Sequence, residues 1–248
     1  MNRDWDSVIK PRGLLEVHAV DLFAHRHYAT ADSTNPYKDW SLYDIKIFID
    51  ELAEAIRKHR RSIRPISIVV KNEDFHALEN GERRLLTSGR FRHWDNQNMK
   101  WITTGKPSQP YMLVLQALMK RAFEISDPKS TVHFILDPSD NDGISRELAH
   151  QIIDGSIWPE SPRMGGMRAE DSEKFPGIQM ADLHAFILNR YVQSQSGHID
   201  AMRLEEQYAQ IALFGDKEEY EMFGMREMQA TLAIATNPTL LEWLRTEG

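Results

Sequence analysis

Cysteine is absent from the 248-residue sequence, which excludes disulfides, thiolate metal ligands and cysteine nucleophiles. No apolar run approaches the roughly 20 residues that a membrane-crossing helix needs. Residues 1–11 are charged and have no apolar centre, unlike a signal peptide. Together these absences predict a cytoplasmic protein that has no membrane partner.

An excess of basic residues is also missing. The chain has 30 Lys and Arg against 37 Asp and Glu, and the net charge of -7 argues against a protein that coats duplexes through a generally positive surface. Local basic patches stay compatible with this balance. The P-loop, G-x-G-x-x-G and G-x-S-x-G motifs and a metal-binding H-E-x-x-H spacing are all absent. P-loop nucleotide hydrolysis and serine hydrolysis are therefore not expected.

Alternating helical and strand-like patterns fill most of the chain. Helices are expected where apolar residues recur at three-and-four spacing or a cap precedes an apolar run, over 42–60, 110–125, 143–153 and 177–195. Strands are expected where β-branched or alternating residues form short runs, over 14–20, 66–70, 131–136 and 163–170. This alternation predicts an α/β fold in a single domain over 1–248. Residues 72–108 form an expected insertion, and a helical tail starts at about 198.

Acidic residues stand at the expected strand ends and helix starts, where α/β folds place functional groups. Asp137 ends one strand, Asp171 follows another, and Glu16 shares a strand face with His18. Asp182 lies in the first turns of an otherwise apolar helix, and an ionised carboxylate is not buried without a partner. Acids gathered in this way can hold divalent cations that cleave phosphodiesters.

Each acid also has a structural interpretation. Asp137 and Asp171 are placed as turn or helix caps would be. Asp182 can pair with an arginine such as Arg190 or Arg168.

Basic and aromatic residues alternate inside the expected insertion. Positive charge suits phosphates and tryptophan rings suit stacking on bases, which makes nucleic acid an expected partner. The alternative is a solvated loop whose tryptophans pack back on the body. The candidate nucleic-acid-binding residues are Arg90, Arg92, Trp94, Lys100 and Trp101.

Three segments resemble motifs of the DUF3800 family of uncharacterised bacterial and phage proteins. They are the Ile135-Leu136-Asp137 strand end, the Asp171-Ser172-Glu173-Lys174 run followed by Gly177-Ile178-Gln179-Met180-Ala181-Asp182, and Glu16-Val17-His18. The last two are similar to the family's "G-[LI]-Q-x-A-D" and "E-x-H" signatures. The resemblance runs from about Leu14 to Tyr191.

The resemblance implies a ribonuclease H-like fold, a mixed sheet flanked by helices, and a Mg²⁺- or Mn²⁺-dependent nuclease. Its implied metal ligands are Asp137 and Asp182, then Glu16 and Asp171, with His18 as a further catalytic candidate. The chain lacks the family's initial strand ending in Asp-Glu-Ser-Gly, so it is expected to be either truncated or divergent. A sheet missing those strands would expose an edge, which makes a homo-oligomer an expected assembly. The alternative function is a non-catalytic module that binds nucleic acid or protein.

Overall fold

The computed structural model describes residues 1–24, 34–87, 92–95, 99–103, 110–137, 163–199, 202–214 and 221–236. The chain divides into two compact units. The first unit consists of residues 1–65 and 170–219, and the second unit of residues 66–169 and 220–248. The prediction of one domain over 1–248 stays a prediction.

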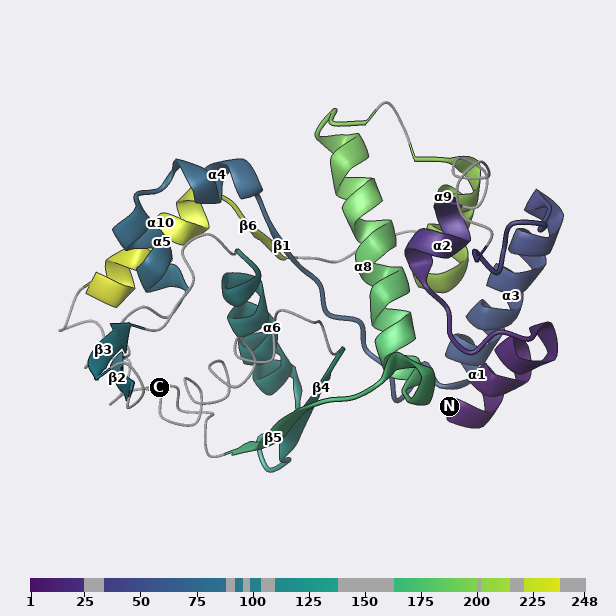
Figure 1. Cartoon of the computed structure of the whole chain (residues 1–248), viewed down its shortest axis with the longest axis horizontal. Coiled ribbons are helices and arrows are strands. Elements are labelled where there is room, and N and C mark those ends of the chain that lie inside the picture. Colours follow the sequence, from purple (N-terminus) through teal and green to yellow (C-terminus); the bar gives the residue numbers. More distant parts are fainter. Residues whose placement is uncertain are drawn as a thin grey trace. The chain divides into compact units, whose positions relative to one another are not determined.

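All the regular elements in the described part of the first unit are helices. Its elements are α1 (Asn2–Ile9), η1 (Lys10–Arg12), α2 (Ala19–Ala24), α3 (Leu42–Lys58), η3 (Ser172–Lys174), α8 (Pro176–Gln195), α9 (Leu204–Ala209) and the π-helical turn η4 (Gln210–Phe214), seen in Figure 1. The predicted helices over 42–60 and 177–195 are therefore confirmed. The predicted strand over 14–20 is wrong, because residues 14–18 belong to no helix or strand and residues 19–20 begin α2.

The core of the first unit lies between α3 and α8. Ser41 and Asp44 form a capping box that starts α3, and the helix buries Ile45, Phe48, Ile49 and Leu52 on one face. α8 contributes residues four apart, among them the fully buried Leu183 and Ile187. The N-terminal helices α1 and α2 complete this core with aromatic side chains. Phe23 of α2 stacks on Phe186 of α8 with ring centroids 5.3 Å apart.

The second unit mixes short strands with helices. Its elements are β1 (Ile68–Val70), α4 (Asn72–Ala77), α5 (Asn80–Leu86), β2 (Arg92–Asp95), β3 (Lys100–Thr103), α6 (Tyr111–Ile125), β4 (Val132–Leu136), β5 (Met164–Ala169), β6 (Glu221–Phe223) and α10 (Met225–Thr236). These elements confirm the predicted mixed α/β class. The predicted insertion over 72–108 contains two helices and a hairpin, and the expected helix over 143–153 lies outside the described residues.

Three two-stranded sheets make up the described β structure. β1 pairs with β6 and β4 with β5, both in parallel, whereas β2 and β3 are antiparallel. The tail beyond 198 is thus not wholly helical, since β6 lies within it. The sequence predicts a buried strand here, but Phe134 is the one buried residue of β4, and it packs on α6.

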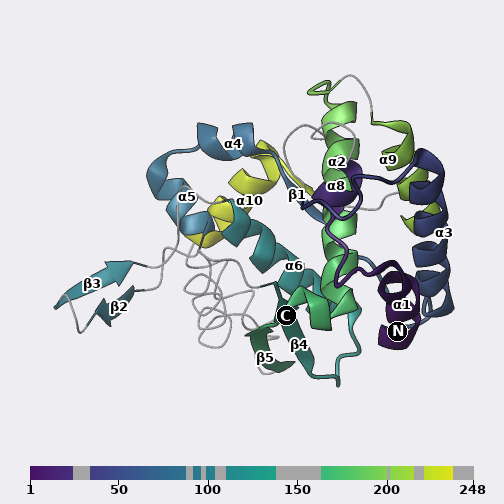
Figure 2. The ribbon, with the colours of Figure 1, turned by 45° about the vertical axis from the view of Figure 1, so that its right-hand side comes forward.

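Figure 2 shows the β2–β3 ribbon extending away from α4, α5 and α10. Those three helices share a separate apolar cluster that includes Phe75, Leu86 and Met228. Within the described residues, no helix combines the length and apolar character that a bilayer crossing requires.

Candidate functional site

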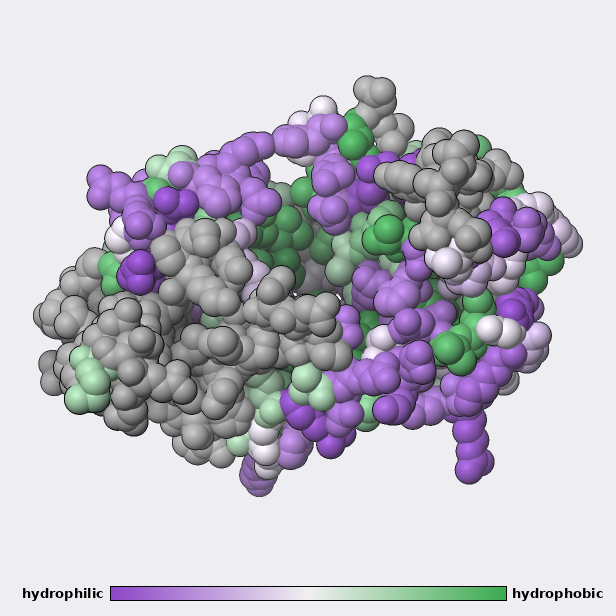
Figure 3. All heavy atoms as spheres, viewed as in Figure 1, coloured by the Kyte–Doolittle hydropathy of each residue, from purple (hydrophilic) through white to green (hydrophobic). Residues whose placement is uncertain are grey.

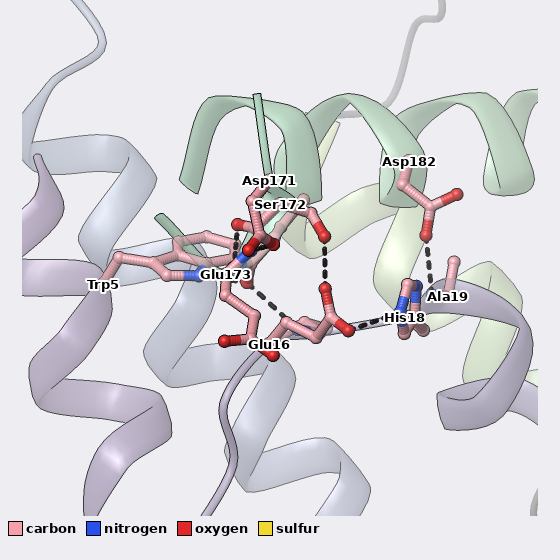
Figure 4. Close-up of polar contacts among 10 residues, drawn as sticks. Trp5, Glu16, His18, Ala19, Asp171, Ser172, Glu173 and Asp182 are labelled. Carbon is pink, nitrogen blue, oxygen red and sulfur yellow. Dashed lines mark hydrogen bonds and ion pairs between the residues drawn. The ribbon is translucent and has the colours of Figure 1, made fainter. Parts of the chain in front are cut away.

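The two segments that carry the most specific motifs meet in the first unit. Residues 14–19 lie beside η3 and the start of α8. Figure 4 shows Glu16 directed at Ser172 of η3 and Asp182 directed at the Ala19 backbone. Gln179 of α8 bonds the Val17 backbone. More than 160 residues separate the two segments in sequence, so this meeting is a property of the tertiary structure.

Gln179 is the best-connected of these side chains. Its carbonyl oxygen Oε1 accepts hydrogen bonds from Trp5 Nε1 at 2.8 Å and from the Val17 backbone N–H at 3.0 Å. Its amide Nε2 donates to the Ser172 carbonyl at 2.7 Å. Gln179 is 1% exposed, so its bonds join α1, residues 14–18 and η3 inside the core. The sequence analysis names Gln179 only as part of a motif. Its place four residues before Leu183 and eight before Ile187, on the buried face of α8, could have indicated a buried polar residue.

Asp182 lies half-buried one turn further along α8. Its Oδ2 atom accepts a hydrogen bond from the Ala19 backbone N–H at 2.9 Å. Ala19 is the first residue of α2, and Leu22 N donates to the His18 carbonyl at 3.0 Å, so the carboxylate stands at the N-terminus of that helix. A negative charge at this end stabilises a helix. The arginine alternative for Asp182 does not hold for Arg190, which bonds Glu206 at 3.1 Å instead.

Glu16 occupies the middle of a three-residue polar chain. Its Oε2 accepts a hydrogen bond from the Ser172 hydroxyl, and its Oε1 lies 2.7 Å from His18 Nε2 (Figure 4). The side chain of Glu16 is 24% exposed and that of His18 is 49% exposed. In a serine hydrolase the histidine stands between the acid and the serine. Here the carboxylate is central, so the arrangement differs from that triad.

The Asp171 side chain contacts residues that follow it directly in the chain. Its side chain caps η3 by accepting from Glu173 N at 3.1 Å, and it lies 3.6 Å from Lys174 Nζ. The capping interpretation of this acid thus has direct geometric support.

Asp137 follows β4 in the second unit and is exposed. Glu16, His18, Asp171 and Asp182 all belong to the first unit.

The described residues do not make a complete cation site. Among them, no group of three or more His, Asp or Glu side chains is arranged to hold a metal ion. Both Glu16 oxygens and Oδ2 of Asp182 are already occupied by protein donors or by His18. Mg²⁺ is usually held by one or two carboxylates together with waters and substrate phosphates. With both Glu16 oxygens engaged, the described side chains do not complete such a site in this arrangement.

Tyr37 is a further polar group near these residues that sequence reasoning missed. Its ring is fully buried against Trp40 and Phe48, and its hydroxyl finds no hydrogen-bond partner in the described part of the chain. Burial raises the pKa of the Tyr37 hydroxyl far above its ordinary value, and the nearby Asp21 and Glu16 carboxylates add to this increase. The phenol therefore stays neutral at physiological pH.

Of the five candidate nucleic-acid-binding residues, four lie in the β2–β3 ribbon and Arg90 lies outside the described residues. The ribbon pairs Arg92 with Thr103, Trp94 with Trp101, and Asp95 with Lys100. Cross-strand partners share a face of a ribbon, and successive residues alternate between its faces. The register therefore places Arg92, Trp94 and Trp101 on one face and Lys100 on the other.

Comparison with known proteins adds no relative: no family model, curated protein or solved structure matches this chain. The resemblance to the DUF3800 family accordingly stays a prediction based on the motifs alone.

Proposed function

We propose that this chain binds nucleic acid through one face of the β2–β3 ribbon. The observation that carries the proposal is the register, which pairs Trp94 with Trp101 and puts Arg92 on the same face. Paired aromatic residues beside a cation form a platform on which bases stack while phosphates are neutralised. The ribbon extends away from the neighbouring helices (Figure 2), and Met99 at its turn is 71% exposed. Both features support access by a ligand strand.

Fluorescence anisotropy with a labelled oligothymidylate tests this proposal. Base stacking is worth about 1–3 kcal/mol per base, so Trp94→Ala and Trp101→Ala are each expected to weaken binding about 5- to 150-fold. His93→Ala is the matched control, because the register places His93 on the opposite face. The proposal is wrong if the parent protein does not bind, or if His93→Ala weakens binding as much as the tryptophan variants.

A metal-dependent nuclease is the second candidate function, acting on phosphodiesters with Mg²⁺ or Mn²⁺. Its specific support is that folding brings Glu16, His18 and Asp182 into one neighbourhood from two distant segments (Figure 4). Because the donors described above do not complete a metal site, this candidate depends on a rearranged Glu16 side chain that frees its carboxylate for the ion. We rank it second for that reason.

Asp182→Asn separates metal binding from structure. The Asn oxygen can still accept the Ala19 N–H, so the variant should fold, while a carboxylate ligand is lost. Calorimetric titration with Mn²⁺ should show heat in the parent, no heat in Asp182→Asn, and unchanged heat in the control Asp6→Asn. Absence of Mn²⁺ binding in the parent would rule the nuclease out.

A ribonuclease H-like arrangement is the finer fold proposal that accompanies the nuclease. The parallel β4–β5 pair supports it, with Asp137 directly after β4 and α8 following β5 in sequence. We also propose a cytoplasmic location, which suits a chain without cysteine.

A further inference from the structure

The turn after α3 carries an unusual density of positive charge for this chain. Residues 57–64 contain five Lys or Arg residues and no acid, although the protein as a whole has a net charge of -7. Arg57, Lys58, Arg60, Arg61 and Arg64 are all exposed. Like charges so close together repel one another. The concentration therefore requires a physical reason.

Two members of this run are neutralised within the protein. Arg57 NH1 lies 3.0 Å from Glu54 Oε2, and Lys58 Nζ lies 3.5 Å from Asp4 Oδ1. Arg60, Arg61 and Arg64 pair with no carboxylate in the described part of the chain. We call these three residues the arginine patch.

Complementation of the helix dipole does not explain the arginine patch. α3 ends at Lys58, and its C-cap is His59. A helix dipole acts within the last turn, and Arg57 and Lys58 already occupy that turn. Arg61 and Arg64 lie beyond it. Their guanidinium groups are thus free to bind an external anion.

We propose that the arginine patch is a phosphate-binding surface of the first unit that takes a nucleic-acid strand, an inference that rests on the proposed function. Arginine guanidinium groups donate paired hydrogen bonds to phosphate oxygens and stay charged at all physiological pH values. An anionic membrane is the less favoured ligand, because a membrane-binding segment presents apolar side chains beside its charges. In residues 59–64 the one apolar side chain, Ile63, is half-buried.

The salt dependence of binding identifies phosphate contacts. Each phosphate neutralised on a single strand contributes about 0.7 to the magnitude of the slope of log K against log salt. Replacing Arg60, Arg61 and Arg64 together by Gln is expected to reduce that magnitude by about 2 in anisotropy titrations with oligothymidylate. Trp94→Ala should weaken binding and leave the slope unchanged, because stacking releases few counterions.

The matched control removes the same total charge elsewhere. Lys10, Arg121 and Lys129 lie outside the arginine patch, and their joint replacement by Gln should leave the slope within about 0.5 of the parent value on the same scale. Circular dichroism and the melting temperature establish that both triple variants fold.

The outcomes distinguish the two proposals. No binding by the parent overturns the proposed function. Binding by the parent with an unchanged slope in the arginine-patch variant overturns this inference alone. Co-sedimentation with phosphatidylserine vesicles, lost in the arginine-patch variant while the oligonucleotide slope is kept, would overturn it in favour of a membrane contact.

Discussion

At the scale of single residues, Gln179 shows how one side chain can hold a site together. It supplies the acceptor for two buried donors, Trp5 Nε1 and the Val17 N–H, and itself donates to Ser172. A buried donor that loses its acceptor carries its full desolvation cost. Within the motif, Gln179 therefore has a structural role.

Gln179→Ala is predicted to lower the free energy of unfolding by about 2–4 kcal/mol, because two buried donors are left without an acceptor. Urea denaturation followed by circular dichroism measures this change. Gln193→Ala on the same helix is the control, since its Nε2 makes only a long 3.4 Å bond at an exposed position. Equal losses in the two variants would contradict the structural role of Gln179.

Tyr37, in contrast to Gln179, is a buried polar residue whose hydroxyl has no hydrogen-bond partner among the described residues. Removing a polar group that has no partner, while keeping the ring, is neutral or stabilising. Tyr37→Phe is therefore predicted to leave the melting temperature unchanged or to raise it, as measured by differential scanning fluorimetry. A loss of more than about 1 kcal/mol would show that the hydroxyl has a bonded partner.

At the scale of elements, a polar network joins α9 to α3. Lys46 Nζ donates to Tyr208 Oη at 2.9 Å and to Asp50 Oδ2 at 3.2 Å, and the Tyr208 hydroxyl donates to Asp50. The hydrogen bond from Tyr208, aided by Lys46, lowers the pKa of Asp50 from its ordinary value. Hydrogen bonds to Tyr208 and Asp50 raise the pKa of Lys46, so it stays protonated at neutral pH.

The sign of the pH dependence follows from the lowered pKa of Asp50. The folded state favours the ionised carboxylate, so its stabilising contribution is complete above the ordinary pKa and is lost as pH falls through the lowered one. Asp50→Asn is predicted to destabilise the protein at neutral pH and to weaken its loss of stability below about pH 4. Urea midpoints measured from pH 7 to pH 3 give this profile. Asp39→Asn, at an exposed loop position, should keep the parent's profile.

Element prediction succeeded for the long helices and for the short strands over 66–70, 131–136 and 163–170, and failed for the strand over 14–20. The amphipathic spacing of α3 and the apolar run of α8 were sufficient to predict both helices. The segment 14–20 alternates like a strand, but Gln179 and Asp182 bind its backbone N–H groups, so it has no need of a neighbouring strand. β5 contains two glycines, which weaken a strand interior. The structure explains one of them, since a Cβ on Gly165 would stand 2.4 Å from the His133 ring.

At the scale of the whole molecule, two units with their own cores are the dominant feature. The first unit is centred on α3 and α8, and the second unit has separate clusters around α6 and α10. In the view of Figure 3, the surface over α1 is largely hydrophilic, as expected for a solvated face. Discontinuous units of this kind cannot be read from sequence, because their segments are assigned only by long-range packing.

Because each unit has its own apolar core, we expect the two units to unfold in separate transitions. Leu183→Ala in the first unit should cost about 2–5 kcal/mol, and Met119→Ala in the second unit a similar amount, since both side chains are fully buried. Differential scanning calorimetry is expected to show two transitions, of which each variant lowers only one. A single transition that both variants shift would indicate that the units unfold together.

The sequence by itself determined the long helices, the mixed α/β class and the places where acids and cations are concentrated. These features depend on local spacing and composition, which neighbouring residues define. Tertiary structure decided the partners of those groups: Asp182 caps α2, Gln179 joins three segments, and Arg60, Arg61 and Arg64 stay unpaired in the described residues. The physical reason is that a polar group's role is set by its partners in space, and these partners lie up to 174 residues away in the chain.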